Sequence, residues 1–279
     1  MVPLGIEKSS IMPVITLAFS PCPNDTFIFY AMTHGKVDTE GITFRYHLAD
    51  IEALNSLAMN REFQLVKISY HAWLFLREAW TLLDAGSALG YGNGPLLISK
   101  RLFTPEQVPG LTVAIPGEYT TAHLLLRIAF PQVREKKIML FSDIEKAILD
   151  DTVDAGVIIH ENRFTYQEKG LRKIMDLGAY WEKLTGAPVP LGGIVADNNL
   201  GSEIIAKLNR IMRNSVVWGM EHPAETMQFV RDHAQEMDES VMRQHIELYV
   251  TGFTVDLGKK GKEAIEIMTQ LAYERKIIG

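Results

Sequence analysis

One histidine stands out among the residues that could do chemistry. His160 ends the apolar run at residues 154–160 and is followed by the polar sequence ENRF. A histidine that points into a cleft from a strand end can act as a general base, because its ordinary pKa lies near neutrality. A structural histidine that only hydrogen-bonds a loop would give the same pattern, so both interpretations stay open at this point.

Small polar residues that directly follow apolar segments form a second group of candidates. The stretch LAFSPCPNDTF places Ser20, Asn24 and Asp25 after the first apolar run, and PGEYTT places Thr120 and Thr121 after a later one. Where such residues begin a helix, free backbone N–H groups and hydroxyls can bind a carboxylate or phosphate. The same residues could also serve only as helix N-caps.

Cys22 is the only cysteine in the chain, and it lies between two prolines. A nucleophilic cysteine needs a nearby base and a setting that lowers its pKa, such as a helix N-terminus. Cys22 lies just ahead of an expected helix, but no Cys/His sequence signature supports a nucleophile. We therefore interpret SPCP as a stiff turn that directs the neighbouring polar residues toward a cleft.

Composition and spacing argue against several classes of function. The 279 residues carry a net charge of −6, and no basic tract suggests a nucleic-acid partner. The eight histidines are scattered and show no H-E-x-x-H or C-x-x-C spacing, so no metal site is expected. A glycine-rich dinucleotide fingerprint and a P-loop are also missing, because GYGNGP has a proline where a helix would have to begin.

The first apolar run bears on where the protein works. IMPVITLAFSPC loosely resembles a lipoprotein signal, but Pro21 precedes the cysteine and the upstream MVPLGIEKSS is not a basic region. The run is also far shorter than the ~20 residues that span a bilayer. We therefore expect a buried first strand, no membrane insertion and a cytoplasmic location, which the single unpaired cysteine also fits.

Strand-like and helix-like segments alternate along the first two thirds of the chain. Expected strands at 14–19, 42–48 and 65–69 alternate with expected helices at 25–34, 50–60 and 70–79. A second alternation has strands at 111–116, 137–141 and 154–160, with a capping box at Ser142 and Glu145. The last third is helical, at 200–221, 224–236, 238–249 and 258–276. This pattern predicts an α/β fold with mostly parallel sheets.

Two Gly/Pro-rich strands, near residues 92–99 and 188–196, flank the second alternation. They predict crossovers between two lobes. The first lobe would be discontinuous, with residues 1–95 and 197–279, and residues 96–196 would form an inserted second lobe. Because ligands of open α/β sheets bind beyond the carboxyl ends of the strands, we expect the site in the cleft between the lobes.

Six motifs occur in order along residues 14–275: SPCPNDTF, KISY, GYGNGPLL, PGEYTTAHLLL, DAGVIIHENRFTY and PLGGI. Together they resemble the 1,4-dihydroxy-6-naphthoate synthase family of the futalosine route to menaquinone. The resemblance implies a two-lobed periplasmic-binding-protein-like (type II) fold. It also implies a carbon–carbon lyase that acts on cyclic dehypoxanthine futalosine, without a metal or organic cofactor.

The same resemblance assigns roles to individual residues. It makes His160 the proton acceptor and implies substrate contacts by Lys67, Ile68, Ser69, Thr120 and Thr121. The expected partner is a small-molecule carboxylate substrate. Two alternatives remain at this stage: a chorismate dehydratase of the same pathway, or a solute-binding protein that shares the fold and catalyses nothing.

Overall fold

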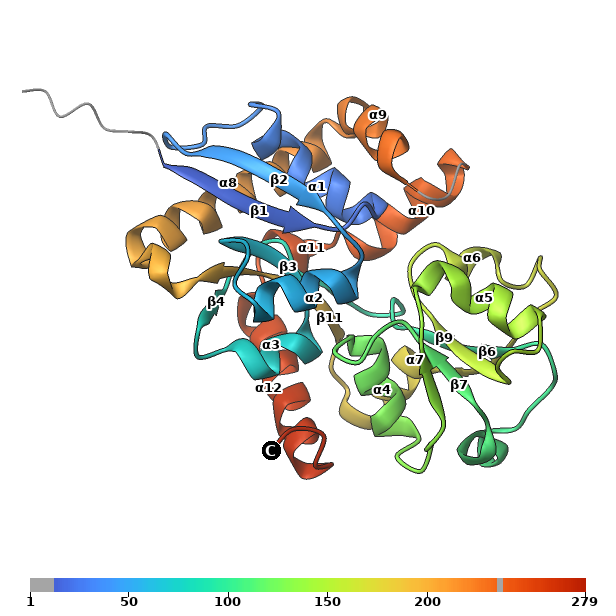
Figure 1. Cartoon of the computed structure of the whole chain (residues 1–279). Coiled ribbons are helices and arrows are strands. Elements are labelled where there is room, and N and C mark those ends of the chain that lie inside the picture. Colours follow the sequence, from blue (N-terminus) through green and yellow to red (C-terminus); the bar gives the residue numbers. More distant parts are fainter. Residues whose placement is uncertain (1–12, 235–237) are drawn as a thin grey trace, which may run out of the picture.

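The computed structural model describes residues 13–234 and 238–279, so residues 1–12 and 235–237, including the MVPLGIEKSS segment, lie outside the described residues. The chain forms two β-sheets, each covered by helices, and crosses from one sheet to the other and back (Figure 1). We call the parts built on these sheets the first lobe and the second lobe. The first sheet contains β1 (Val14–Phe19), β2 (Thr43–Leu48), β3 (Leu65–Ser69), β4 (Trp80–Leu82), β5 (Ala88–Gly90) and β11 (Val189–Asp197).

The first sheet mixes parallel and antiparallel pairing. Its strand order is β2-β1-β3-β11-β4, with β5 also paired to β11. β1 runs parallel to β2 and β3, as the sequence predicts, but β11 runs antiparallel to its three neighbours. This strand pairs in the first sheet along its length, from Val189 opposite Gly90 to Asp197 opposite Trp80. The strand expected as a crossover near residues 188–196 is β11, and the sequence-based boundary at residue 196 falls within it.

The second sheet follows the order β10-β6-β9-β7-β8. It contains β6 (Leu96–Ser99), β7 (Val113–Ile115), β8 (Lys136–Ile138), β9 (Ala155–Ile158) and β10 (Arg172–Asp176). β7 runs parallel to β8 and β9, whereas β6 runs antiparallel to β9 and β10. The carboxyl ends of β7 and β9 therefore lie at one edge of this sheet, and the chain segments that follow them both reach the space between the lobes.

The structure has helices at the expected segments, with bounds that agree to within a few residues, and short helices at residues 162–165 and 252–255 that were not expected. The helices are α1 (Pro23–Thr33), α2 (Ile51–Met59), α3 (Tyr70–Leu76), α4 (Thr121–Ala129), α5 (Phe141–Leu149), α6 (Asn162–Thr165), α7 (Leu177–Thr185), α8 (Ser202–Glu221), α9 (Pro223–His233), α10 (Glu239–Tyr249), α11 (Gly252–Val255) and α12 (Gly258–Glu274). The last residues of the expected helix at 224–236 lie partly outside the described residues. Asp50 caps α2 through its side chain and accepts hydrogen bonds from the amides of Glu52 and Ala53.

The expected capping box at the start of α5 is wrong. The helix begins at Phe141, with Leu140 as its N-cap and no side-chain cap. The hydroxyl of Ser142 contacts the carboxylate of Asp143 instead of a backbone amide. Phe141 is buried and its ring centroid lies 4.7 Å from that of His160. Burial of an aromatic side chain, rather than a hydroxyl cap, therefore sets the start of this helix and shortens the strand expected at 137–141.

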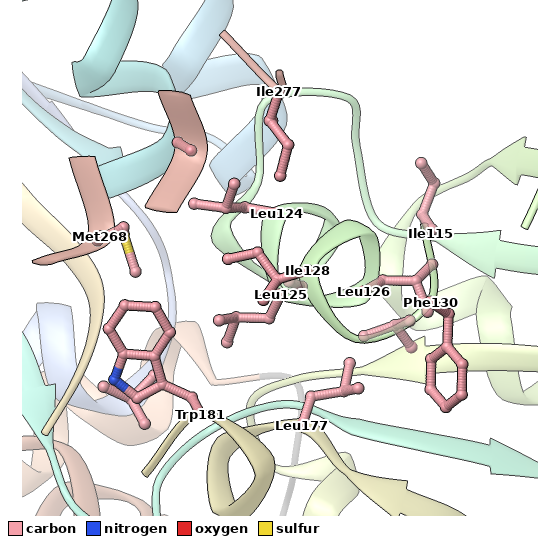
Figure 2. Close-up of a cluster of buried hydrophobic side chains, with 14 of the residues drawn as sticks. Ile115, Leu124, Leu125, Leu126, Ile128, Phe130, Leu177, Trp181, Met268 and Ile277 are labelled. Atoms are coloured by element: carbon pink, nitrogen blue, oxygen red, sulfur yellow. The ribbon is translucent and has the colours of Figure 1, made fainter. Parts of the chain in front are cut away.

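Helix α12 packs against both lobes. Figure 2 shows Met268 of α12 and Ile277 beside Leu124 of α4, with Trp181 of α7 nearby, and these residues belong to one buried hydrophobic cluster. The same cluster contains Tyr70 from α3 in the first lobe. The lobes thus share apolar contacts through this cluster. Among the described residues, no helix combines the length and apolar character needed to cross a bilayer.

Candidate active site

A pocket lies where the two lobes meet, lined by side chains from both of them. The first lobe lines it with residues from the β1–α1 turn and from β3. The second lobe lines it with the start of α4 and with His160, which lies two residues after the end of β9. The pocket thus lies beyond the carboxyl ends of β1, β3, β7 and β9, where the sequence predicts the ligand site.

Strand β3 presents alternate side chains to the pocket. Lys67 and Ser69 line it, whereas Ile68 points to the opposite face and packs in a core cluster with Leu54 and Val195. Successive side chains of a strand point to opposite sides of the sheet, so a run of three neighbours cannot all face one ligand. The structure therefore does not bring the side chain of Ile68 to the pocket, in contrast to the substrate contact that the family resemblance implied.

The β1–α1 turn places a buried carboxylate on the pocket wall. Lys67 Nζ lies 2.6 Å from Oδ1 of Asp25, and both side chains are almost fully buried. Asp25 also accepts hydrogen bonds from Ser20 Oγ at 2.7 Å and from Asn24 Nδ2 at 2.8 Å. A buried ion pair is tolerated only when its remaining polar atoms are satisfied. The network therefore holds these four side chains in one arrangement on the pocket wall.

The start of α4 offers backbone donors rather than free hydroxyls. Thr120 is the N-cap: its Oγ1 accepts from the amide of His123 and donates to the carbonyl of Gly117. The hydroxyl of Thr121 donates to the carbonyl of Leu191 at 2.7 Å. Because the first amides of a helix have no acceptor within the helix, those of Thr121 and Ala122 are available to an anion in the pocket.

His160 reaches the pocket from the turn after β9. Its backbone adopts a left-handed conformation, with φ of +59°, which is uncommon for a residue other than glycine and directs the ring toward the first lobe. Burial lowers the pKa of His160 to about 4, with nearby Lys67 acting in the same direction and Asp25 opposing it. The imidazole is therefore neutral near pH 7 and has a lone pair that can accept a proton.

Cys22 lies beside this imidazole. Its Sγ is 3.3 Å from Nδ1 of His160 and 3.9 Å from Nε2. Burial raises the pKa of the Cys22 thiol well above its usual range, and the carboxylates of Glu161 and Asp25 add to this effect. The thiol is therefore protonated, which disfavours a thiolate nucleophile although the expected partner base is adjacent.

Several side chains around His160 were missed by the sequence-based assignment. His245 stacks beside His160 with ring centroids 6.1 Å apart, and its Nε2 lies 2.8 Å from Oδ1 of Asn24. Tyr249 lines the pocket, and burial raises its pKa to about 12. Both belong to α10, whose sequence carries no motif. The sequence offered one hint of this surrounding, the acidic residue Glu161 directly after His160. Its carboxylate lies 3.9 Å from Nδ1 of His245.

Two further contacts join the lobes on the other side of the pocket. The carboxylate of Glu52 on α2 accepts from the amide of Tyr119, at 3.1 and 3.3 Å to its two oxygens. A Cβ on Gly117 would lie only 2.4 Å from Cδ of Glu52, so glycine is needed for this close approach. The amide of His71 on α3 donates to the hydroxyl of Thr121. The lobes are therefore in direct polar contact around the pocket.

The chain has relatives of known name. Residues 15–274 match the family model described as menaquinone biosynthesis. A 1,4-dihydroxy-6-naphthoate synthase from Thermus thermophilus is 41% identical, over 91% of this chain and 92% of the relative. A synthase of the same name from Streptomyces coelicolor is 42% identical, over 93% of each.

Solved structures show the same architecture. A protein from Archaeoglobus fulgidus superposes with a TM-score of 0.90 and 34% identity, covering 95% of this chain and 98% of the other. A Candida albicans protein with the generic periplasmic binding protein fold superposes with a TM-score of 0.66 at 12% identity, covering 94% of each chain. The fold predicted from the sequence, α/β with two lobes of the periplasmic-binding-protein type, is thereby confirmed.

Proposed function

This chain belongs to the menaquinone biosynthesis family, and from this premise we propose that it is the enzyme that converts cyclic dehypoxanthine futalosine to 1,4-dihydroxy-6-naphthoate. The observation that carries the proposal is the position of His160, a neutral imidazole on the wall of the interlobe pocket. The reaction breaks a carbon–carbon bond and is started by removal of a proton, for which such a base is suited.

The substrate carboxylate docks at the start of α4. The amides of Thr121 and Ala122 supply donors, and the helix N-terminus supplies a favourable partial charge. The hydroxyls of Thr120 and Thr121 are already bonded to Gly117 and Leu191, so they hold the helix start in place and do not themselves bind the anion. Across the pocket, Ser69 and the network of Ser20, Asn24, Asp25 and Lys67 contact the polar remainder of the substrate.

His160 takes the proton through Nε2. In the tautomer that carries its proton on Nδ1, the lone pair is on Nε2. Transfer of the substrate proton to this nitrogen leaves an electron pair on the substrate, which opens the ring and leads to carbon–carbon cleavage. Aromatisation of the naphthoate product then drives the reaction forward. The contacts that join the lobes exclude water during these steps.

We propose that the reaction takes place in the cytoplasm, on a small-molecule carboxylate, without a nucleic-acid partner. The two alternatives, a chorismate dehydratase and a solute-binding protein, are not favoured, because both curated relatives carry the synthase name.

Product analysis tests the proposal. Purified protein is incubated separately with cyclic dehypoxanthine futalosine and with chorismate, and products are followed by mass spectrometry. We expect 1,4-dihydroxy-6-naphthoate from the first substrate and no conversion of the second. Consumption of chorismate would identify a dehydratase instead. Tight binding of either compound without turnover would support a solute-binding protein.

A further inference from the structure

Three side chains that can bind a metal ion meet beside the pocket. Sγ of Cys22, a ring nitrogen of His160 and a carboxylate oxygen of Glu161 all lie within 4.8 Å of one another. Cys22 begins α1 in the first lobe, whereas His160 and Glu161 follow β9 in the second lobe. Cys22 and Glu161 are only 4% and 5% exposed, whereas His160 is half-buried and faces the pocket.

His245 places a further buried donor beside Glu161. Asn24 donates its Nδ2 to Asp25, which leaves its Oδ1 facing His245 Nε2 at 2.8 Å. An amide oxygen only accepts, so Nε2 of His245 carries the proton and Nδ1 carries a lone pair. Nδ1 is fully buried and has no hydrogen-bond partner within residues 13–234 and 238–279. It lies 3.9 Å from Oε2 of Glu161.

A buried lone pair without a donor is costly, by about 1–3 kcal/mol. A metal ion would satisfy it. A histidine that ligates a metal through one ring nitrogen usually donates its other N–H to a polar oxygen, which is the arrangement of His245 and Asn24. The separation of two of the other donors is also close to that of ligands on one ion. Bonds of about 2.3 Å to sulfur and 2.0–2.1 Å to nitrogen put these atoms roughly 3.5 Å apart in a tetrahedral site, and Sγ lies 3.3 Å from Nδ1 of His160.

We propose that Cys22, His160, Glu161 and His245 form a binding site for a thiophilic divalent transition-metal ion of the zinc class. Thiolate, imidazole and carboxylate are the ligands that such ions prefer. On binding, the ion displaces the proton of the Cys22 thiol to solvent, so the thiolate and the Glu161 carboxylate together balance its two charges.

The ion acts as an inhibitor and not as a cofactor. It occupies a nitrogen of His160, so the imidazole cannot take the substrate proton, and it ties the first lobe to the second through ligands from each. Binding of the metal is independent of the proposed reaction, because it is measured without substrate, whereas the inhibition rests on the proposed role of His160.

Cobalt(II) is the probe of choice, because a thiolate bound to cobalt gives a charge-transfer band in the near ultraviolet. The sequence contains one cysteine, so any such band must come from Cys22. Chelator-treated protein is titrated with Co²⁺ alone. We expect the band to saturate at one equivalent, to disappear in Cys22→Ser and to be displaced by Zn²⁺. His245→Gln and Glu161→Gln should each weaken Co²⁺ binding by at least about tenfold.

His123→Gln is the matched control, because His123 is also buried with one ring nitrogen unpartnered but lies away from the cluster. It should bind Co²⁺ like the wild-type protein. Circular dichroism checks that each variant is folded. If Cys22→Ser does not fold, the Co²⁺ titration of His245→Gln still tests the proposal. Absence of the band in the wild-type protein would overturn the proposal, as would equal Co²⁺ affinity in His245→Gln, Glu161→Gln and wild type.

Discussion

The thiol sulfur of Cys22 lies 3.3 Å from Nδ1 of His160, although 138 positions separate the two residues in the chain. One residue begins the first helix of the first lobe, and the other follows a strand of the second lobe. Their contact places a soft nucleophile and a base together, yet burial keeps both the thiol and the imidazole neutral. The pair is therefore suited to proton transfer by His160 and to the proposed metal binding, rather than to nucleophilic catalysis by a thiolate.

Replacing His160 should remove the base and leave the pocket largely intact. We expect His160→Asn to lower kcat by about 10²–10⁴-fold, the usual contribution of a general base, with little change in substrate affinity. Asparagine tolerates the left-handed backbone at this position, so the fold is retained. Steady-state kinetics and substrate titration measure both quantities. The exposed His222→Asn serves as the control, and an unaltered kcat in His160→Asn would exclude the assigned role.

The neutral thiol leads to a different expectation for Cys22. Cys22→Ser should retain most of the turnover, because a protonated, buried thiol contributes no nucleophile. The measurement is kcat at saturating substrate in the presence of a chelator. Loss of most of the activity, with the fold intact by circular dichroism, would mean that Cys22 takes part in catalysis.

The ion pair of Lys67 and Asp25 should be important for stability because it is buried. Lys67→Met leaves the Asp25 carboxylate unpaired in the interior, and we expect the free energy of unfolding to fall by about 3–5 kcal/mol. Lys146→Met breaks an exposed pair with Asp150 and should cost less than about 1 kcal/mol. Urea denaturation of both variants checks the difference, and equal small losses would show that the Lys67 pair is unimportant.

The close approach of Gly117 to Glu52 should control contact between the lobes. Gly117→Ala would push its Cβ into the Glu52 side chain, 2.4 Å from Cδ, and displace the carboxylate from the amide of Tyr119. We expect a higher KM because the closed arrangement is weakened. Adding Glu52→Ala removes the clash, so the double variant should show less than the sum of the two single effects. Strictly additive effects would contradict this steric coupling.

His71 predicts a pH-dependent part of the stability. Burial lowers its pKa from 6.5 to about 4, with His123 and Arg127 of α4 acting in the same direction. On acidification the unfolded chain therefore binds a proton before the folded protein does. The stabilisation is fully present above pH 6.5 and is lost as the pH falls toward 4, by up to about 3 kcal/mol.

His71→Gln removes this group, so its free energy of unfolding should fall less steeply than that of the wild-type protein between pH 6.5 and 4. Denaturation curves collected across that range compare the two proteins. Parallel pH profiles would mean that His71 titrates alike in the folded and unfolded states.

Local sequence patterns were sufficient for most elements of the fold. The strands Val14–Phe19 and Leu65–Ser69 were predicted with the bounds that the structure has, because short apolar runs bounded by polar or turn residues define them. The helix expected at 50–60 lies at α2, whose start Asp50 caps by accepting from amides two and three residues away. His160 was singled out because it ends such a strand.

Tertiary structure alone decided which side chains share the site. Ile68 was grouped with Lys67 and Ser69, but the pleat of β3 sends it to the core. His245 meets Asn24 across 221 residues, and Cys22 meets His160 across 138. No local spacing rule detects such contacts. The spacing of residues in the sequence therefore gave no sign that Cys22, His160 and Glu161 lie together. The packing of two lobes, set by burial of apolar surface over the whole chain, brings these residues together.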